Sequence, residues 1–164
     1  MSSRRQFCAS AGLLCAGLAL TRRTGFAAAS EPPPPLWKYN VKWTGQFAVG
    51  TDALFVTDGD ALVTALDAAT GAKRWSHRTG GPIDRSPLVH DGVVYAGSSD
   101  HILYALKAAS GEVVWRFQTD GPIGATPAVE DKLLFVSSGD NSLYALDFAA
   151  AKLQWSAEIG PIQY

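Results

Sequence analysis

A repeat with a period of 40 residues restricts the fold of this sequence more than any other feature. Trp75, Trp115 and Trp155 mark the period, since each lies 40 positions after the one before. Self-similarity at a fixed period of this size is typical of chains built from stacked copies of one small structural unit. The repeat is therefore the basis of the predictions that follow.

Other positions keep the same step, so chance is a poor explanation for the spacing of the tryptophans. An Ala-Leu pair recurs ahead of each tryptophan, and Gly-Pro-Ile recurs after each, the last time one residue early. The recurring positions are Asp60, Asp100 and Asp140; Ala65, Ala105 and Ala145; and Gly81, Gly121 and Gly160.

Each period has the pattern of four short β-strands. Turn-forming residues separate runs that are rich in Val, Leu, Tyr and Trp, and Gly92 supplies a glycine where a tight hairpin needs a positive φ. Four strands in about 40 residues is the period of a β-propeller blade, whereas helical repeats lack such regularly spaced turn glycines. The predicted fold is all-β, a partial β-propeller of about three to four four-stranded antiparallel blades. In the second unit the four runs are residues 85–89, 93–98, 102–107 and 113–119.

The N-terminal segment predicts export. Residues 1–29 combine adjacent arginines, a short apolar run and a small-residue end, which is the composition of a secretory signal. The apolar run is shorter than the roughly 20 residues that a membrane-spanning helix needs. Arg4 and Arg5 resemble the twin-arginine export motif, although Cys8 and Ala9 depart from its usual ending. The expected location is the periplasm or another exported compartment, reached by the twin-arginine pathway.

The remaining chain divides into a spacer and the repeats. Residues 30–36 form a proline-rich spacer that we expect to be extended, and residues 37–164 carry the propeller repeats. Within them, residues 37–43 look like the outer strand of a preceding blade. A closed propeller has roughly 4–8 blades, so the ring is incomplete. We favour a fragment of a longer propeller over two copies that pair into a homodimer. The repeat units span about residues 45–79, 82–119 and 122–159.

Removal of the signal changes both the charge and the cysteine content. Four of the 14 basic residues and none of the 15 acidic residues lie in it, so the mature chain carries 10 − 15 = −5. A negative surface without a basic cluster argues against nucleic-acid binding. Both cysteines, Cys8 and Cys15, are lost with the signal, which excludes a disulfide and cysteine metal ligands. Leu14 precedes Cys15 where a lipidated cysteine follows a small residue, so no lipid anchor is expected.

The segment that ends at each tryptophan resembles the tryptophan-docking motif of the pyrroloquinoline quinone (PQQ) repeat family. The motif runs Ala-x-Asp-x-x-Thr-Gly-x-x-x-Trp. Its first copy here consists of Ala65, Asp67, Thr70, Gly71 and Trp75. The resemblance covers essentially the whole mature chain and implies the propeller fold.

The later copies depart from the motif. The second has Lys107 for Asp and Ser110 for Thr, and the third has Ala150-Ala151 for Thr-Gly, which predicts a looser blade there. The resemblance implies structural roles: the aspartate binds turn amides, and the tryptophan is clamped between blades with its N–H on a backbone partner. The residues assigned to this docking role are Ala65, Asp67, Thr70, Gly71, Trp75, Ala105, Ser110, Gly111, Trp115, Ala145, Asp147 and Trp155.

The sequence predicts no catalytic, cofactor-binding or metal-ligating residues. In the family that the chain resembles, quinoprotein dehydrogenases hold PQQ in a central funnel, often against a disulfide, with a calcium ion bound by carboxylates and an amide. Asn141 beside Asp140 is the nearest oxygen-rich pair, but an aspartate that recurs in every unit is typical of a turn. His77, His90 and His101 lack the spacing of metal ligands.

Two hypotheses about function follow. In the first, the chain is an exported, non-catalytic propeller that binds protein partners or acts as a scaffold in the cell envelope. The family precedent is the propeller subunit of the outer-membrane protein assembly machinery. In the second, the chain is the N-terminal part of a PQQ-dependent dehydrogenase whose cofactor residues lie on other blades. Neither hypothesis includes a nucleic-acid partner or a membrane span after signal cleavage.

Overall fold

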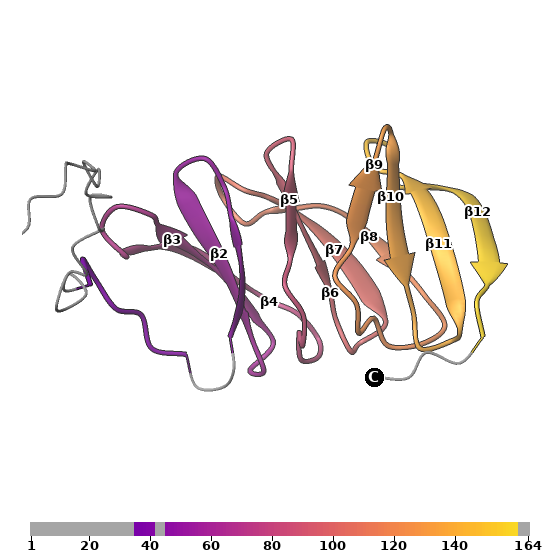
Figure 1. Cartoon of the computed structure of the whole chain (residues 1–164), viewed down its shortest axis with the longest axis horizontal. Helices are drawn as coiled ribbons and strands as arrows, with labels where there is room; N and C mark the ends of the chain where they lie inside the picture. The colour runs from indigo at the N-terminus through magenta and orange to yellow at the C-terminus, as the bar shows by residue number, and fades with distance from the viewer. Residues whose placement is uncertain (1–34, 42–44, 161–164) are drawn as a thin grey trace, which may run out of the picture. The chain divides into compact units, whose positions relative to one another are not determined.

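The described chain is made of strands and turns. The computed structural model describes residues 35–41 and 45–160, so the predicted signal and export motif lie outside the described residues. Twelve strands form three four-stranded sheets, and all their pairings are antiparallel (Figure 1). The predicted all-β fold with four-stranded antiparallel blades is confirmed. We name the sheets blade 1, blade 2 and blade 3 in chain order.

Each blade is a meander in which strands that are neighbours in the sheet are neighbours in the sequence. The strands of blade 1 are β1 (Gln46–Val49), β2 (Ala53–Asp58), β3 (Leu62–Asp67) and β4 (Lys73–Arg78). Those of blade 2 are β5 (Leu88–His90), β6 (Val93–Gly97), β7 (Ile102–Lys107) and β8 (Val113–Gln118). Those of blade 3 are β9 (Ala128–Glu130), β10 (Leu133–Ser137), β11 (Ser142–Asp147) and β12 (Lys152–Glu158).

Two segments differ from the predicted strands. The run over residues 85–89 contributes only its end to β5, because Pro87 has no N–H for a strand ladder and the carbonyl of Arg85 accepts the hydroxyl of Thr57 in blade 1 instead (3.1 Å). Residues 35–41 carry no strand, although an outer strand was expected from Trp37 onward. None of the described strands pairs with this segment, so no strand ladder includes it in this part of the chain.

The hydrophobic core lies between the blades. Side chains alternate along a strand, so Val94 of β6 packs toward blade 1 while its neighbour Tyr95 packs toward blade 3. Ile83 and Ile123, from the repeated Gly-Pro-Ile segments, close the two cores. A fully buried large apolar side chain such as Phe55 contributes roughly 1.5–3 kcal/mol. Each blade is therefore stabilised through its neighbours.

Candidate functional site

The tryptophan of one blade docks on the next blade. The indole N–H of Trp75 donates a hydrogen bond to the carbonyl of Ala108 in blade 2 (2.9 Å). In the same way, Trp115 donates to the carbonyl of Phe148 in blade 3 (3.0 Å). Both acceptors lie in the turn between the third and fourth strands. The half-buried indole thus makes its apolar contacts without leaving its N–H unpaired.

The glycine of the docking turn is required for two reasons. Gly111 has a φ of 75°, in the left-handed region that favours glycine. A Cβ added to it would also lie 2.6 Å from Cε3 of Trp75, which is closer than real contacts allow. The turn of blade 1 repeats this arrangement, since Gly71 has a φ of 71°.

The motif alanine lies directly opposite the tryptophan. Ala65, Ala105 and Ala145 are fully buried, and each pairs across the sheet with the tryptophan of its own blade. The register shifts immediately after each alanine, which is a β-bulge. In blade 1, Ala65 pairs with Trp75 and Leu66 pairs with Lys73, so that Arg74 is the extra residue.

Arg74 and Asp67 form a charged cluster at the docking turn of blade 1. Oδ1 of Asp67 accepts hydrogen bonds from the amides of Ala69 and Thr70 and from the Thr70 hydroxyl. Its Oδ2 pairs with the Arg74 guanidinium at 2.7 Å, and Arg74 also reaches Asp52 at 2.8 Å. The hydrogen bonds from Arg74 first, and then from Thr70, hold the pKa of Asp67 well below its ordinary value of 3.8.

The departures from the motif change the docking turns of the other blades. Lys107 offers no carboxylate to the turn amides of blade 2, and it pairs instead with Glu112 at 2.7 Å. In blade 3, Asp147 accepts the amides of Ala149 and Ala150, both at 3.0 Å. Ala151 then stands at the glycine position with a φ of 54°, which is strained for a residue with a Cβ. The looser third blade stays a prediction, and this strain is its physical basis.

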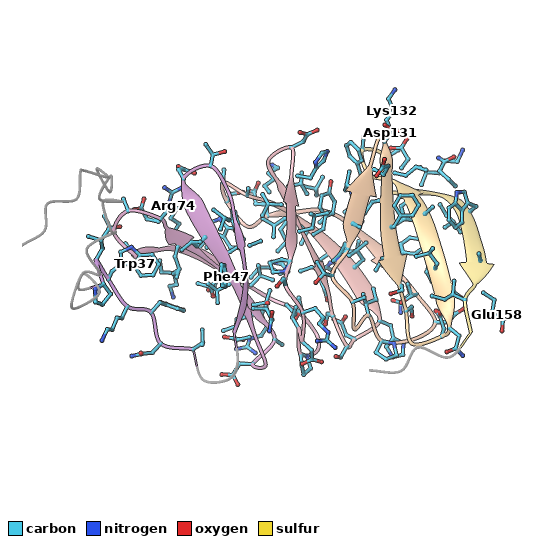
Figure 2. All side chains as sticks on the ribbon, in the orientation of Figure 1. Trp37, Phe47, Arg74, Asp131, Lys132 and Glu158 are labelled. Atoms are coloured by element: carbon cyan, nitrogen blue, oxygen red, sulfur yellow. The ribbon has the colours of Figure 1, made fainter. Side chains whose placement is uncertain are left out.

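Trp37 also docks, which the repeat did not predict. Its indole N–H donates to the carbonyl of Ala68 in the turn of blade 1 (3.1 Å), and its ring lies against Gly71 (Trp37 is labelled in Figure 2). Trp37 precedes Trp75 by 38 residues instead of 40. The shortened spacing hid its equivalence to the other tryptophans.

A second set of polar contacts joins the blades at the recurring aspartates. Oδ2 of Asp140 accepts the backbone amide of Asp120, which follows blade 2, at 3.0 Å and the hydroxyl of Tyr144 at 2.8 Å. Its Oδ1 accepts the amide of Ser142. Asp100 makes the equivalent bonds in blade 2, with Gly80, Tyr104 and Ile102 as donors. The recurrence of a tyrosine four residues after each of these aspartates was a usable signal for the pair.

Asp140 and Asn141 are the oxygen-rich pair for which the sequence predicted a turn and no metal site. Asp140 has both carboxylate oxygens in hydrogen bonds, and Asn141 occupies a left-handed turn position with a φ of 67°. Within residues 35–41 and 45–160, no three His, Cys, Asp or Glu side chains gather closely enough to hold a metal ion. Nor does this part of the chain contain a helix that is long and apolar enough to span a bilayer.

The three histidines have different surroundings. His77 lies in β4 with its ring 5.7 Å from that of Tyr104, and burial, with help from Arg116, lowers its pKa below 6.5. His90 lies edge-on to Phe148, and His101 is a turn residue with a φ of 71°. None of the three is placed beside a nucleophile or a second histidine in the contacts that the structure describes.

The outer faces of blades 1 and 3 are apolar and are covered by no further blade among the described residues. Phe47 and Val49 of β1 are 61% and 66% exposed on the first blade. On the last blade, Trp155 is 42% exposed, and Leu153 and Ile159 are exposed with it. The described residues therefore offer exposed apolar side chains on these two faces, beside polar contacts that hold the turns and the blades together.

Comparison with known proteins identifies the blades. The family model described as outer membrane protein assembly factor BamB matches residues 28–106 and 97–162. BamB from Moraxella catarrhalis is similar in structure, with a TM-score of 0.61 and 22% identity over 70% of this chain and 35% of its own. No curated protein sequence matches the chain.

Two further solved structures share the fold. The quinohemoprotein alcohol dehydrogenase from Comamonas testosteroni has a TM-score of 0.60 and 22% identity over 68% of this chain and 20% of its own. The computationally designed Ika4 protein has a TM-score of 0.70 and 13% identity over 77% and 81%. The chain thus spans about a third of the length of BamB and a fifth of that of the dehydrogenase. Since the family model matches most of its residues, the chain belongs to the BamB family of PQQ-repeat β-propellers.

Proposed function

We propose that the chain is an exported, non-catalytic PQQ-like repeat propeller that acts as a protein-binding or scaffold module in the cell envelope. The observation that carries this proposal is that the aspartates of the repeats hold turns and blade contacts, while apolar side chains stay exposed on the outer blades. Carboxylate oxygens accept hydrogen bonds from backbone amides in turns and between blades at Asp67, Asp100, Asp140 and Asp147. Large apolar side chains, among them Phe47, Val49 and Trp155, stay exposed on the outer faces of blades 1 and 3, and exposed apolar patches mark interaction sites.

The place of action is inferred from the N-terminus and the family. Residues 1–29 have the composition of an export signal, and the matching family is named for assembly at the outer membrane. Both observations support a periplasmic location. Protein partners at the envelope are the kind of ligand that such a location supplies.

Site-specific crosslinking tests the binding role. A photoreactive amino acid is placed at Val49, on the exposed apolar face of blade 1, in cells that export the chain. The matched control carries it at Lys132, in the exposed hairpin between β9 and β10 (Figure 2). The proposal expects a discrete adduct with an envelope protein from Val49 and none from Lys132. Equal labelling at both positions, or none at either, would contradict it.

A second candidate is a piece of a PQQ-dependent dehydrogenase, which the similarity to the quinohemoprotein alcohol dehydrogenase motivates. The described residues do not fit the carboxylated quinone. The cavity of about 350 Å³ beside Phe55 is lined by Arg74, whose guanidinium is held by Asp52 and Asp67. The cavity of about 230 Å³ beside Arg85 also contains Asp84. Titration with PQQ and Ca²⁺, followed by tryptophan fluorescence, tests this candidate. Stoichiometric quenching would favour the dehydrogenase and overturn the non-catalytic proposal.

A further inference from the structure

A cavity of about 350 Å³ lies where blade 1 meets blade 2, and residues of both blades line it. Ala53 and Phe55 of β2, which are buried, and Val89 of β5, which is half-buried, give it an apolar lining. Asp52 and Ala109 also line it and are exposed, so the cavity is open to solvent. We name it the blade 1–2 pocket.

Between blades 2 and 3, two aromatic rings occupy the corresponding place. His90 and Phe148 lie edge-on to each other with their ring centroids 5.0 Å apart. The residues 40 positions earlier, which line the blade 1–2 pocket, are Gly50 and Ala108. The backbone supports the correspondence of Ala108 and Phe148, since the amide of each donates to a carbonyl in the hairpin between the first two strands of its own blade. The pocket is therefore the space that a pair of rings fills at the next interface.

The size and lining of the pocket suit an aromatic ring. An apolar cavity of roughly 150 Å³ is enough to bind benzene, so the blade 1–2 pocket has room for a phenyl or phenol ring and part of the chain that carries it. Phe55 offers such a ring an aromatic partner. A Cβ added to Gly50 would lie 2.9 Å from Cε2 of Phe55, which is closer than real contacts allow. Because neither Gly50 nor Ala108 supplies a ring, the ring that fills this space has to come from another molecule.

The charges beside the pocket favour a cation next to the ring. Arg74, labelled in Figure 2, lines the pocket, but its guanidinium is held by the carboxylates of Asp52 at 2.8 Å and Asp67 at 2.7 Å. With two carboxylates and one guanidinium, this cluster has a surplus of negative charge. The Asp52 side chain is 74% exposed, so a Lys or Arg of a bound segment can approach it from solvent.

We propose that the blade 1–2 pocket binds a Phe or Tyr side chain of a partner protein, in a segment where Lys or Arg flanks the ring. The ring takes the place that Phe148 takes at the next interface, and the flanking cation pairs with Asp52. Aromatic side chains that fill a pocket of this kind are typical anchors of protein interfaces. This inference rests on the proposed function for the protein nature of the partner, and it adds the site and the chemistry of the segment that is recognised.

Titration of the isotope-labelled full chain with short peptides, followed by amide NMR spectra, tests the pocket. The probe is acetyl-Lys-Phe-Lys-amide, and acetyl-Lys-Ala-Lys-amide is the control with the same charge and no ring. We expect saturable shifts of the Gly50, Gly92 and Ala109 amides with the probe, and binding that is roughly tenfold weaker or less with the control. Acetyl-Glu-Phe-Glu-amide keeps the ring and reverses the charge, so it should bind several-fold more weakly than the probe. Equal binding of the alanine peptide or of the acidic peptide would overturn the proposal.

Two substitutions at equivalent positions separate the pocket from the rest of the surface. Ala108→Phe gives blade 2 the residue that blade 3 has and fills the pocket, so the affinity for the probe should fall roughly tenfold or more. Phe148→Ala is the matched control, because it makes the opposite exchange at the next interface and should leave the shift of the Gly50 amide unchanged. Unchanged binding of the probe by Ala108→Phe would overturn the proposal. Each variant is compared only when its spectrum has the dispersion of a folded chain.

A variant at the rim tests the charge without entering the pocket. Asp52→Asn removes the exposed carboxylate, so the difference in affinity between the basic and the acidic peptide should become several-fold smaller. The Asp52 side chain is largely exposed, so this variant keeps the core of the blades intact. An undiminished difference would overturn the pairing of the flanking cation with Asp52.

The peptide titration and the crosslinking from Val49 can fail separately. The titration uses purified chain and needs neither export nor an envelope partner. An adduct from Val49 without saturable binding of the probe would keep the proposed function and overturn the pocket. Saturable binding that Ala108→Phe abolishes, without an adduct from Val49, would support the pocket although the proposed function had failed its own test.

Discussion

At a docking turn, the absence of a side chain decides whether two blades can meet. The glycine accepts a left-handed backbone and lets an indole rest on its Cα, so two requirements coincide at one residue. The neighbouring aspartate adds a charged group whose hydrogen bonds hold the same turn. These two residue types can be tested separately because the chain contains a matched position for each.

Gly111→Ala and Gly92→Ala together separate the contact with the Trp75 ring from the strain of a left-handed backbone. An alanine at position 111 would have to keep a backbone φ of 75°, and its Cβ would press on the Trp75 ring. We therefore expect a loss of about 2–4 kcal/mol in the free energy of unfolding. Gly92→Ala is the control, because Gly92 has a φ of 74° but no heavy atom within 4 Å of an added Cβ. It costs only about 1–2 kcal/mol. Urea unfolding measures both, and equal losses would contradict a role for the indole contact.

The Asp67 cluster predicts a pH dependence. Because the folded state lowers the pKa of Asp67, the carboxylate stabilises the fold fully above its unfolded value of 3.8 and loses this contribution as the pH falls through the folded pKa. Asp67→Asn therefore lowers the melting temperature at pH 6, and the difference from the unchanged chain shrinks below pH 3.8. Asp131→Asn, in an exposed hairpin, is the control. A difference between the two chains that is independent of pH would contradict the charge-based account.

At the scale of elements, the repeat predicted those strands that carry marked residues. The third strands contain Ala-Leu and the outer strands contain the tryptophan, and both lie near their expected positions. The first strands of blades 2 and 3 are short because Pro87 and Pro127, which directly precede them, have no N–H for a ladder. The bonds of Asp100 to Gly80 join residues 20 apart across two blades. Such contacts depend on how blades stack, which a periodic pattern does not contain.

Asp140 is the test of this link between elements. Asp140→Ala leaves the Asp120 and Ser142 amides and the Tyr144 hydroxyl without their acceptor, so we expect a loss of about 2–4 kcal/mol in unfolding free energy. Tyr144→Phe removes one donor and costs about 0.5–1.5 kcal/mol. Hydrogen exchange should quicken at Asp120 and Ser142 in the alanine variant. Unchanged exchange at Asp120 would show that Asp140 does not join blade 2 to blade 3.

At the scale of the whole molecule, each blade completes its core only with a neighbour. The two cores lie between blades, so the outward faces of the first and last blades have the composition of an interface. Stacked repeats of this kind gain stability from nearest-neighbour contacts. Under the proposed envelope function, the compartment decides which proteins can meet these faces, so the predicted export signal is the next feature to test.

The export prediction is tested with two arginine pairs in one signal. Arg4→Lys/Arg5→Lys keeps the charge of the n-region but removes the twin-arginine motif, so the precursor should accumulate in the cytoplasm. Arg22→Lys/Arg23→Lys makes the same chemical change beyond the apolar run and should leave export intact. Fractionation of cells, with an antibody against the chain, gives the share of mature protein in the periplasm. Equal export of both variants would show that the charge of the n-region is sufficient for export. The general secretory route would then replace the twin-arginine pathway, and the proposed envelope function would be unaffected.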